Sequence, residues 1–251
     1  MDLPGALASE MERLAKEVSE PCVVAVVGEV KVGKSTFVNA YLGEDLAKVG
    51  THETTATINY FSYGNPDENK PVRVHWRSGA PPTLKSRAFL DSLQGNDEET
   101  LKEAEGVDHL EYFLPNSYLK QITLVDTPGT GTVVKEHQER AEEFLLRKRL
   151  RERHHQETQE IRDRADAVIY LVGPVAKADD KEFLEGFQRA TGGQASALNA
   201  IGVLSKIELY PDVVRRREEL AEKTASQLKD NLNTVIPVGA GVQRALDRLL
   251  N

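Results

Sequence analysis

The sequence has little cysteine and no long apolar run. Its one cysteine, Cys22, excludes a disulfide within the chain, and its apolar neighbours indicate a buried thiol. The longest apolar run, Val23 to Val27, is far too short to cross a bilayer. The first residues, MDLPGALASEMERL, contain acids and no apolar segment of the kind that a secretory signal needs. These absences predict a soluble protein of a reduced compartment, the cytoplasm.

An excess of basic residues is also missing. The chain has 32 Lys and Arg against 40 Asp and Glu, a net charge of −8. Such a chain is not expected to bind nucleic acid, so any phosphate site must be local. Its 251 residues, 29% charged and 39% hydrophobic, suit one folded α/β domain.

Buried strands alternate with helical stretches along the chain. Helices are predicted at 6–19, 34–43, 86–105, 179–190, 213–232 and 242–250. Strands are predicted at 22–27, 56–64, 72–76, 108–114, 122–126, 167–173, 200–206 and 234–240. The alternation predicts an α/β fold with a doubly wound, mostly parallel sheet.

A phosphate-binding loop follows the first strand. Residues 28–35, GEVKVGKS, fit G-x-x-x-x-G-K-[ST] between a strand and a helix. In such a loop backbone N–H groups surround the phosphates, Lys34 reaches the β- and γ-phosphates, and Ser35 binds Mg²⁺. The predicted nucleotide-binding residues here are Gly28, Glu29, Val30, Lys31, Val32, Gly33, Lys34, Ser35 and Thr36.

Three further motifs sit at strand ends. In VDTPG, Asp126 would hold Mg²⁺ through water and the Gly129 N–H would meet the γ-phosphate. In SKIE, the Lys206 stem would pack on a purine and the Glu208 carboxylate would accept from guanine. Ser205 and the backbone of Val238, Gly239 and Ala240 complete the predicted base site.

With TTATI (54–58) and ADAVIYLV, these motifs resemble the dynamin superfamily of large GTPases, its bacterial branch above all. The resemblance covers about residues 21–240 and implies a P-loop GTPase domain with an extended sheet. It implies that Thr55 completes the Mg²⁺ shell and orients the attacking water, with Thr54 as second candidate. The expected ligands are GTP and GDP with Mg²⁺.

Three departures from the family pattern bear on function. Ser205 and Glu208 replace the usual Asn or Thr and Asp, no glutamine follows DTPG, and Val30 stands where eukaryotic dynamins carry a catalytic glutamine. We predict that the protein is a GTPase. One alternative is a nucleotide-dependent binding switch with negligible turnover, which the missing glutamines favour. The other is a P-loop ATPase, which requires that Glu208 does not recognise guanine.

Lys31 occupies the fourth place of the loop. In relatives this place helps to bind a monovalent cation or carries an internal arginine finger. Lys31 would then supply positive charge itself and replace the cation, so that the catalytic set is Lys31, Lys34, Thr55 and Gly129. The equally weighted alternative is a lysine pointing to solvent.

The resemblance implies a nucleotide-dependent homodimer that pairs through the nucleotide face. Asp179 falls on the family's acidic interface position, with Asp180 beside it. An N-cap role for these two residues is at least as well supported, and the two roles can coexist. The charged segment 136–164 is predicted to be a solvated helix or loop, with a partner-contacting switch element as the alternative.

The helices near 1–20 and 241–251 could be parts of the neck that joins such a domain to a stalk. Family members bend or fuse membranes through that stalk and a lipid-binding tip, for which this chain has no room. Membrane association is therefore expected only in a longer protein.

Overall fold

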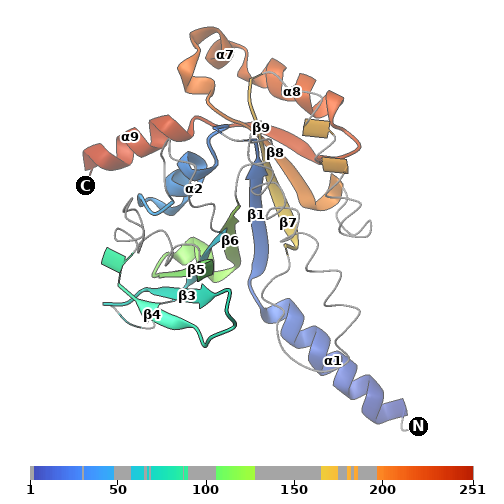
Figure 1. Ribbon diagram of the computed structural model, residues 1–251. Helices are drawn as coiled ribbons and strands as arrows, with labels where there is room; N and C mark the ends of the chain where they lie inside the picture. The colour runs from blue at the N-terminus through green and yellow to red at the C-terminus, as the bar shows by residue number, and fades with distance from the viewer. Residues whose placement is uncertain are drawn as a thin grey trace.

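The computed structural model describes residues 3–29, 31–47, 58–64, 67, 69–86, 88–89, 106–127, 165–174, 180–181, 184–185 and 197–250. Within these ranges the chain forms one nine-stranded sheet with helices on its flanks and one helix that extends away from it (Figure 1).

The sheet has the order β4-β3-β5-β2-β6-β1-β7-β8-β9. The strands are β1 (Cys22–Gly28), β2 (Ile58–Tyr63), β3 (Val72–Trp76), β4 (Thr83–Lys85), β5 (Val107–Leu114), β6 (Ile122–Asp126), β7 (Ala167–Val172), β8 (Ala200–Leu204) and β9 (Thr234–Pro237). The half from β6 to β9 is parallel. β2 turns antiparallel to β6, and β3 pairs antiparallel with both β5 and β4. The prediction of a mostly parallel α/β sheet is confirmed.

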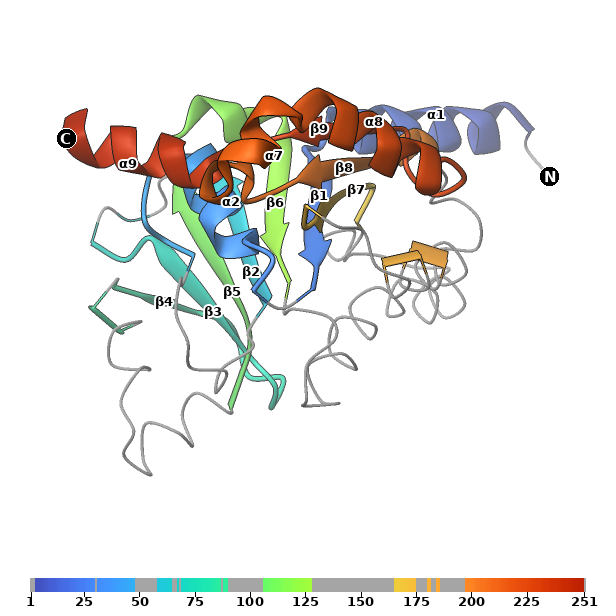
Figure 2. The same ribbon diagram turned by 90° about the horizontal axis from the view of Figure 1, so that it is seen from above.

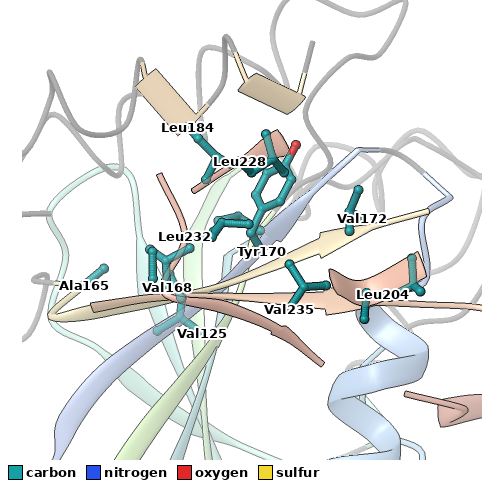
Figure 3. Close-up of a cluster of buried hydrophobic side chains, with 14 of the residues drawn as sticks. Val125, Ala165, Val168, Tyr170, Val172, Leu184, Leu204, Leu228, Leu232 and Val235 are labelled. Carbon is teal, nitrogen blue, oxygen red and sulfur yellow. The ribbon is translucent and has the colours of Figure 1, made fainter. Parts of the chain in front are cut away.

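β1 lies at the centre and is buried on both faces. Val23, Ala25 and Val27 belong to one apolar cluster, and Val24 and Val26 belong to the cluster on the opposite face. Figure 3 shows the first cluster, where Leu228 and Leu232 pack on Tyr170. Apolar layers on both faces explain the unbroken CVVAVV run, because neither face of β1 meets water.

The helices are α1 (Leu3–Ser19), α2 (Lys34–Leu42), α7 (Pro211–Arg215), α8 (Arg217–Gln227) and α9 (Ala240–Leu250). In both views α1 extends away from the sheet, and α9 lies beside α2 (Figures 1 and 2). The apolar stripe on α1 is exposed: Leu7, Met11, Leu14 and Val18 are 46–86% exposed. No helix among the described residues is both long and apolar enough to cross a membrane.

Several predicted boundaries are wrong. The strand β4 was not predicted, since its short, exposed TLK segment carries no periodic pattern. The helix predicted at 213–232 is broken at Arg216 into α7 and α8, and it starts earlier, at Pro211. The strands predicted to reach 206 and 240 end at Leu204 and Pro237, which releases the base motif from the sheet.

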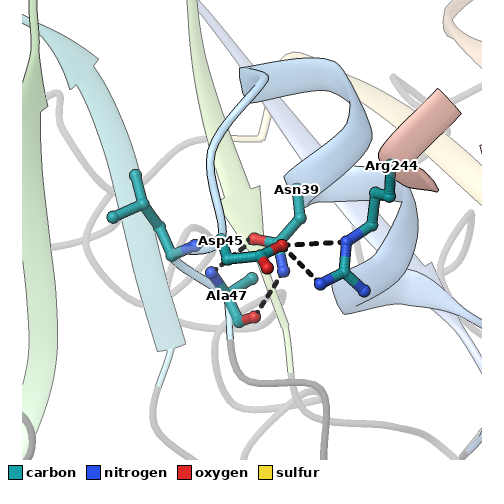
Figure 4. Close-up of polar contacts among 5 residues, drawn as sticks. Asn39, Asp45, Ala47 and Arg244 are labelled. Carbon is teal, nitrogen blue, oxygen red and sulfur yellow. Dashed lines mark hydrogen bonds and ion pairs between the residues drawn. The ribbon is translucent and has the colours of Figure 1, made fainter. Parts of the chain in front are cut away.

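A buried asparagine holds the loop that follows α2. Asn39 donates to Ala47 O at 2.7 Å, and its Oδ1 accepts from the N–H groups of Leu46 and Ala47 at 2.9 and 2.6 Å. Arg244 of α9 forms an ion pair with Asp45 in the same loop (Figure 4). The end of α2 is thereby fixed to its own loop and to the last helix.

Candidate phosphate and base site

The phosphate loop passes from β1 to α2 as the sequence predicts. Gly28 has φ 147°, and a Cβ there would lie 2.6 Å from the backbone oxygen of Leu171 on the neighbouring strand. Gly33, with φ 110°, is the N-cap of α2. Both glycines are therefore required, one by space and both by backbone conformation. The first helical bond of α2 runs from the Phe37 N–H to Gly33 O, so the N–H groups of α2 through Thr36 have no acceptor within the helix.

Lys34 is buried at the base of this loop, only 8% exposed. Its Nζ donates to Gly28 O and Glu29 O, each at 2.9 Å. Burial lowers the pKa of Lys34 to about 8, although the carboxylates of Asp126 and Glu29 raise it. An ammonium group has three N–H donors, so two backbone bonds fix its position and leave one donor for an anion.

Ser35 and Asp126, which are predicted to hold Mg²⁺, lie next to each other. Ser35 Oγ donates to Asp126 Oδ2 at 3.3 Å, while Asp126 Oδ1 is buried and lacks a hydrogen-bond partner among the described residues. Burial raises the pKa of Asp126 to about 6, against the lowering effect of Lys34 and Ser35. One hydroxyl and one carboxylate fit Mg²⁺, which takes few protein ligands beside phosphate oxygens and water. No set of three His, Cys, Asp or Glu in the described parts of the chain could hold another metal.

Thr127 is a positioning residue that the sequence analysis missed. Its Oγ1 donates to Val26 O at 2.9 Å, and the residue is 4% exposed. This bond ties the start of the DTPG motif to the strand that carries the phosphate loop. Its only sequence signal is a hydroxyl directly after the motif's aspartate.

The base motif is bonded directly to the phosphate loop. Ser205 Oγ lies 2.7 Å from Val32 O and 3.1 Å from Val172 O, both of which can accept from it. Lys206, with φ 59°, donates from Nζ to the backbone oxygen of Lys31. A Cβ placed on Gly33 would lie 3.8 Å from Lys206 Cε, so the Lys206 stem passes close to this glycine. Ser205 therefore still connects the base motif to the phosphate loop, although it replaces the usual Asn or Thr.

The remaining base-site residues gather at the start of α9. Glu208 Oε1 accepts from the Gly241 N–H at 3.0 Å, and a Cβ placed on Gly239 would lie 3.8 Å from Glu208 Oε2. Val238 donates its N–H to Leu204 O at 2.9 Å, so this amide is used by the sheet. Gly239 and Ala240 therefore remain the candidates for a backbone contact to guanine O6.

Asp180 is not displayed at the surface. It is 3% exposed, and its Oδ1 accepts from the Tyr170 hydroxyl at 2.7 Å. This buried bond corrects the expectation that its side chain meets a second copy. Five predicted residues and one segment lie outside the described residues: Val30, Thr54, Thr55, Gly129, Asp179 and 136–164.

The arrangement can hold a phosphorylated purine. Lys34 and the α2 N-terminus offer positive charge, and Ser35 and Asp126 offer hard oxygen ligands. Lys206 is bonded to the phosphate loop, and Glu208 lies at the start of α9. The hydrogen bonds from Ser205 and Lys206 fix the spacing between the phosphate and base halves.

Comparison with known proteins gives a consistent result. The model of the dynamin family matches residues 24–207. The isoniazid-induced protein IniC of Mycobacterium tuberculosis is 29% identical over 81% of this chain, and a probable transmembrane GTPase, FZO-like, of Arabidopsis thaliana is 25% identical over 93%. A solved bacterial dynamin, from an oligomerised pair described as sensing and tethering membranes, superposes with a TM-score of 0.56 at 20% identity over 98% of the chain.

The chain spans only part of these proteins. It covers 38% of the mycobacterial protein, 20% of the plant protein and 37% of the solved chain. The structural match supports the fold.

Proposed function

Because the chain belongs to the dynamin family of GTPases, we propose that it binds GTP with Mg²⁺ and hydrolyses it, stimulated by pairing of two copies across the nucleotide face. The observation that carries this proposal is the bonding of Ser205 and Lys206 to the phosphate loop. A nucleoside triphosphate requires a purine-binding motif at a fixed distance from a phosphate-binding loop.

The described residues divide the work of binding and charge stabilisation. Lys34 would place positive charge beside the β- and γ-phosphates, and the α2 N-terminus would add backbone donors. Mg²⁺, held by Ser35 and through water by Asp126, would neutralise charge that develops on the phosphates. Thr55 and Gly129 complete the proposed site as water-orienting and γ-phosphate-binding groups.

Lys31 is proposed as the internal positive charge that replaces a monovalent cation. Its side chain is exposed on the loop, and its φ of 63° places the residue in a conformation that glycine prefers. A lysine kept in this conformation bears a steric cost, and a charge positioned over the β–γ bridge would account for it.

Turnover at several protein concentrations tests the pairing. We expect phosphate release from GTP per mole of chain to rise with concentration, with no comparable release from ATP in parallel. The fraction of chains in dimers rises with protein concentration, so turnover that requires the dimer rises with it. Turnover that stays constant with concentration would contradict stimulation by pairing, and none at any concentration would favour a passive switch.

Asp126→Asn should lower GTP turnover and should also remove the pH dependence of stability that this carboxyl causes. Turnover should fall about 10–100-fold, because a water-bridged metal partner is lost. Asp126 has a raised pKa when folded, so it stabilises the fold most below its ordinary value of 3.8 and loses that contribution as pH rises through about 6. This loss is roughly 3 kcal/mol in the nucleotide-free protein and should be absent in the variant.

Urea unfolding at pH 4 and pH 7 without nucleotide or Mg²⁺ measures that difference. Asp212→Asn is the matched control, because this carboxylate is 93% exposed. An Asp126→Asn variant with unchanged turnover would rule out the metal role. An unchanged pH dependence would show that burial does not perturb this carboxyl.

The terminal helices are proposed as attachment points for another part of a longer protein. The apolar stripe of α1 and the exposed Val242, Leu246 and Leu249 of α9 support this proposal. Exposed apolar stripes on amphipathic helices are what a neck would cover.

A further inference from the structure

The last helix begins against the carboxylate of Glu208. Gly241 is the second residue of α9, and its N–H donates to Glu208 Oε1 at 3.0 Å. An amide in the first turn of a helix has no acceptor within the helix, and the helix N-terminus favours negative charge. The contact therefore fixes one oxygen of the proposed base-reading carboxylate.

Gly241 makes this contact possible by having no side chain. A Cβ at this position would lie 2.4 Å from Glu208 Oε1 and 3.3 Å from its carboxyl carbon. Gly241 is not among the residues with positive φ, so the backbone does not demand glycine here. What requires glycine is the space that the carboxylate occupies.

The second carboxylate oxygen of Glu208 indicates that this side chain binds a ligand. Glu208 Oε2 is buried, and it has no hydrogen-bond partner in the described part of the chain. A buried acceptor without a partner is costly, and native structures keep few of them. Guanine carries adjacent N1–H and N2–H₂ donors that match a carboxylate; adenine has no donor at these positions.

We propose that Gly241 is a specificity-determining position for guanine recognition. Glutamate is one methylene longer than the aspartate common at this place, and the gap at Gly241 accommodates the extra length. With Oε1 bonded to the helix, the carboxylate orientation is set and Oε2 is reserved for the base. The inference rests on the proposed function, because it assumes that Glu208 reads the nucleotide.

Gly241→Ala tests this directly. Competition against a fluorescent GDP analogue gives the affinities for GDP and ADP. The preference for GDP over ADP should fall about tenfold, because the displaced carboxylate leaves a guanine donor unpaired. The clash falls on the far end of a flexible side chain, so the fold should survive. Circular dichroism checks this, and Val242→Ala, half exposed on the same helix, is the control.

Rescue separates positioning from general damage. In Glu208→Asp/Gly241→Ala the shorter carboxylate no longer reaches the new methyl group, so guanine preference should return to within about threefold of wild type, less than the tenfold loss. A single Gly241→Ala variant with unchanged preference, or a double variant as poor as the single, would overturn this inference alone. A wild-type chain without preference for GDP would overturn the proposed function as well.

Discussion

Lys34→Ala should weaken GTP and GDP binding roughly 30- to 4,000-fold, since removing one partner of a buried, hydrogen-bonded charge pair costs about 2–5 kcal/mol. The lysine is positioned by Gly28 O and Glu29 O before any ligand arrives. Its charge therefore needs no reorganisation to meet the phosphates. Titration with a fluorescent guanine nucleotide in the presence of Mg²⁺ measures the loss.

The matched control is Lys229→Ala, which removes an exposed lysine near the end of α8 and should leave affinity unchanged. A Lys34→Ala chain that binds GDP within threefold of wild type would show that the phosphates do not occupy the loop. Thermal unfolding of the free variant is a necessary companion measurement, because the two carbonyl groups lose their donor.

Lys31→Ala should lower turnover about 10³-fold, the low end for an internal arginine finger, because lysine is a less directional donor. Affinity for GTP should change little, since the proposed charge acts on the transition state rather than on ground-state binding. Single-turnover hydrolysis at saturating GTP separates these two quantities.

Two further variants isolate the side chain from the backbone. Lys31→Gly removes the charge while suiting a φ of 63°, so it should lose as much turnover as the alanine variant and gain some stability. Lys31→Arg keeps the charge and should retain most turnover. Full turnover in the glycine variant would assign Lys31 to solvent and return the role to a bound cation.

The sequence predicts the sheet and the phosphate loop well, because both are local. CVVAVV is apolar at every position, as a strand buried on both faces requires, and the loop motif carries its own strand and helix context. Asp126 and Glu208 are predicted as site residues from their motifs at strand ends, and their roles stay predictions.

Contacts between distant segments are not visible in the sequence. Nothing near residue 241 indicates that its glycine makes room for Glu208, since that contact depends on where α9 begins. Asp180 is predicted as an interface residue or a helix N-cap, yet its carboxylate accepts from the Tyr170 hydroxyl inside the core. Thr127 acts through Val26, far away in the chain, and only the folded sheet joins them.

The central position of β1 has a consequence for how the chain is made. The pairing of β1 with β6 begins at Cys22 opposite Ile122, and its pairing with β7 begins at Val24 opposite Ala167. Both neighbours are therefore synthesised long after β1. Parallel pairing between strands far apart in the sequence forms slowly. β1 therefore remains unpaired during synthesis until β6 and β7 have been made. The proposed base site includes Glu208 and Gly241, so nucleotide binding should appear only after the start of α9 has been synthesised.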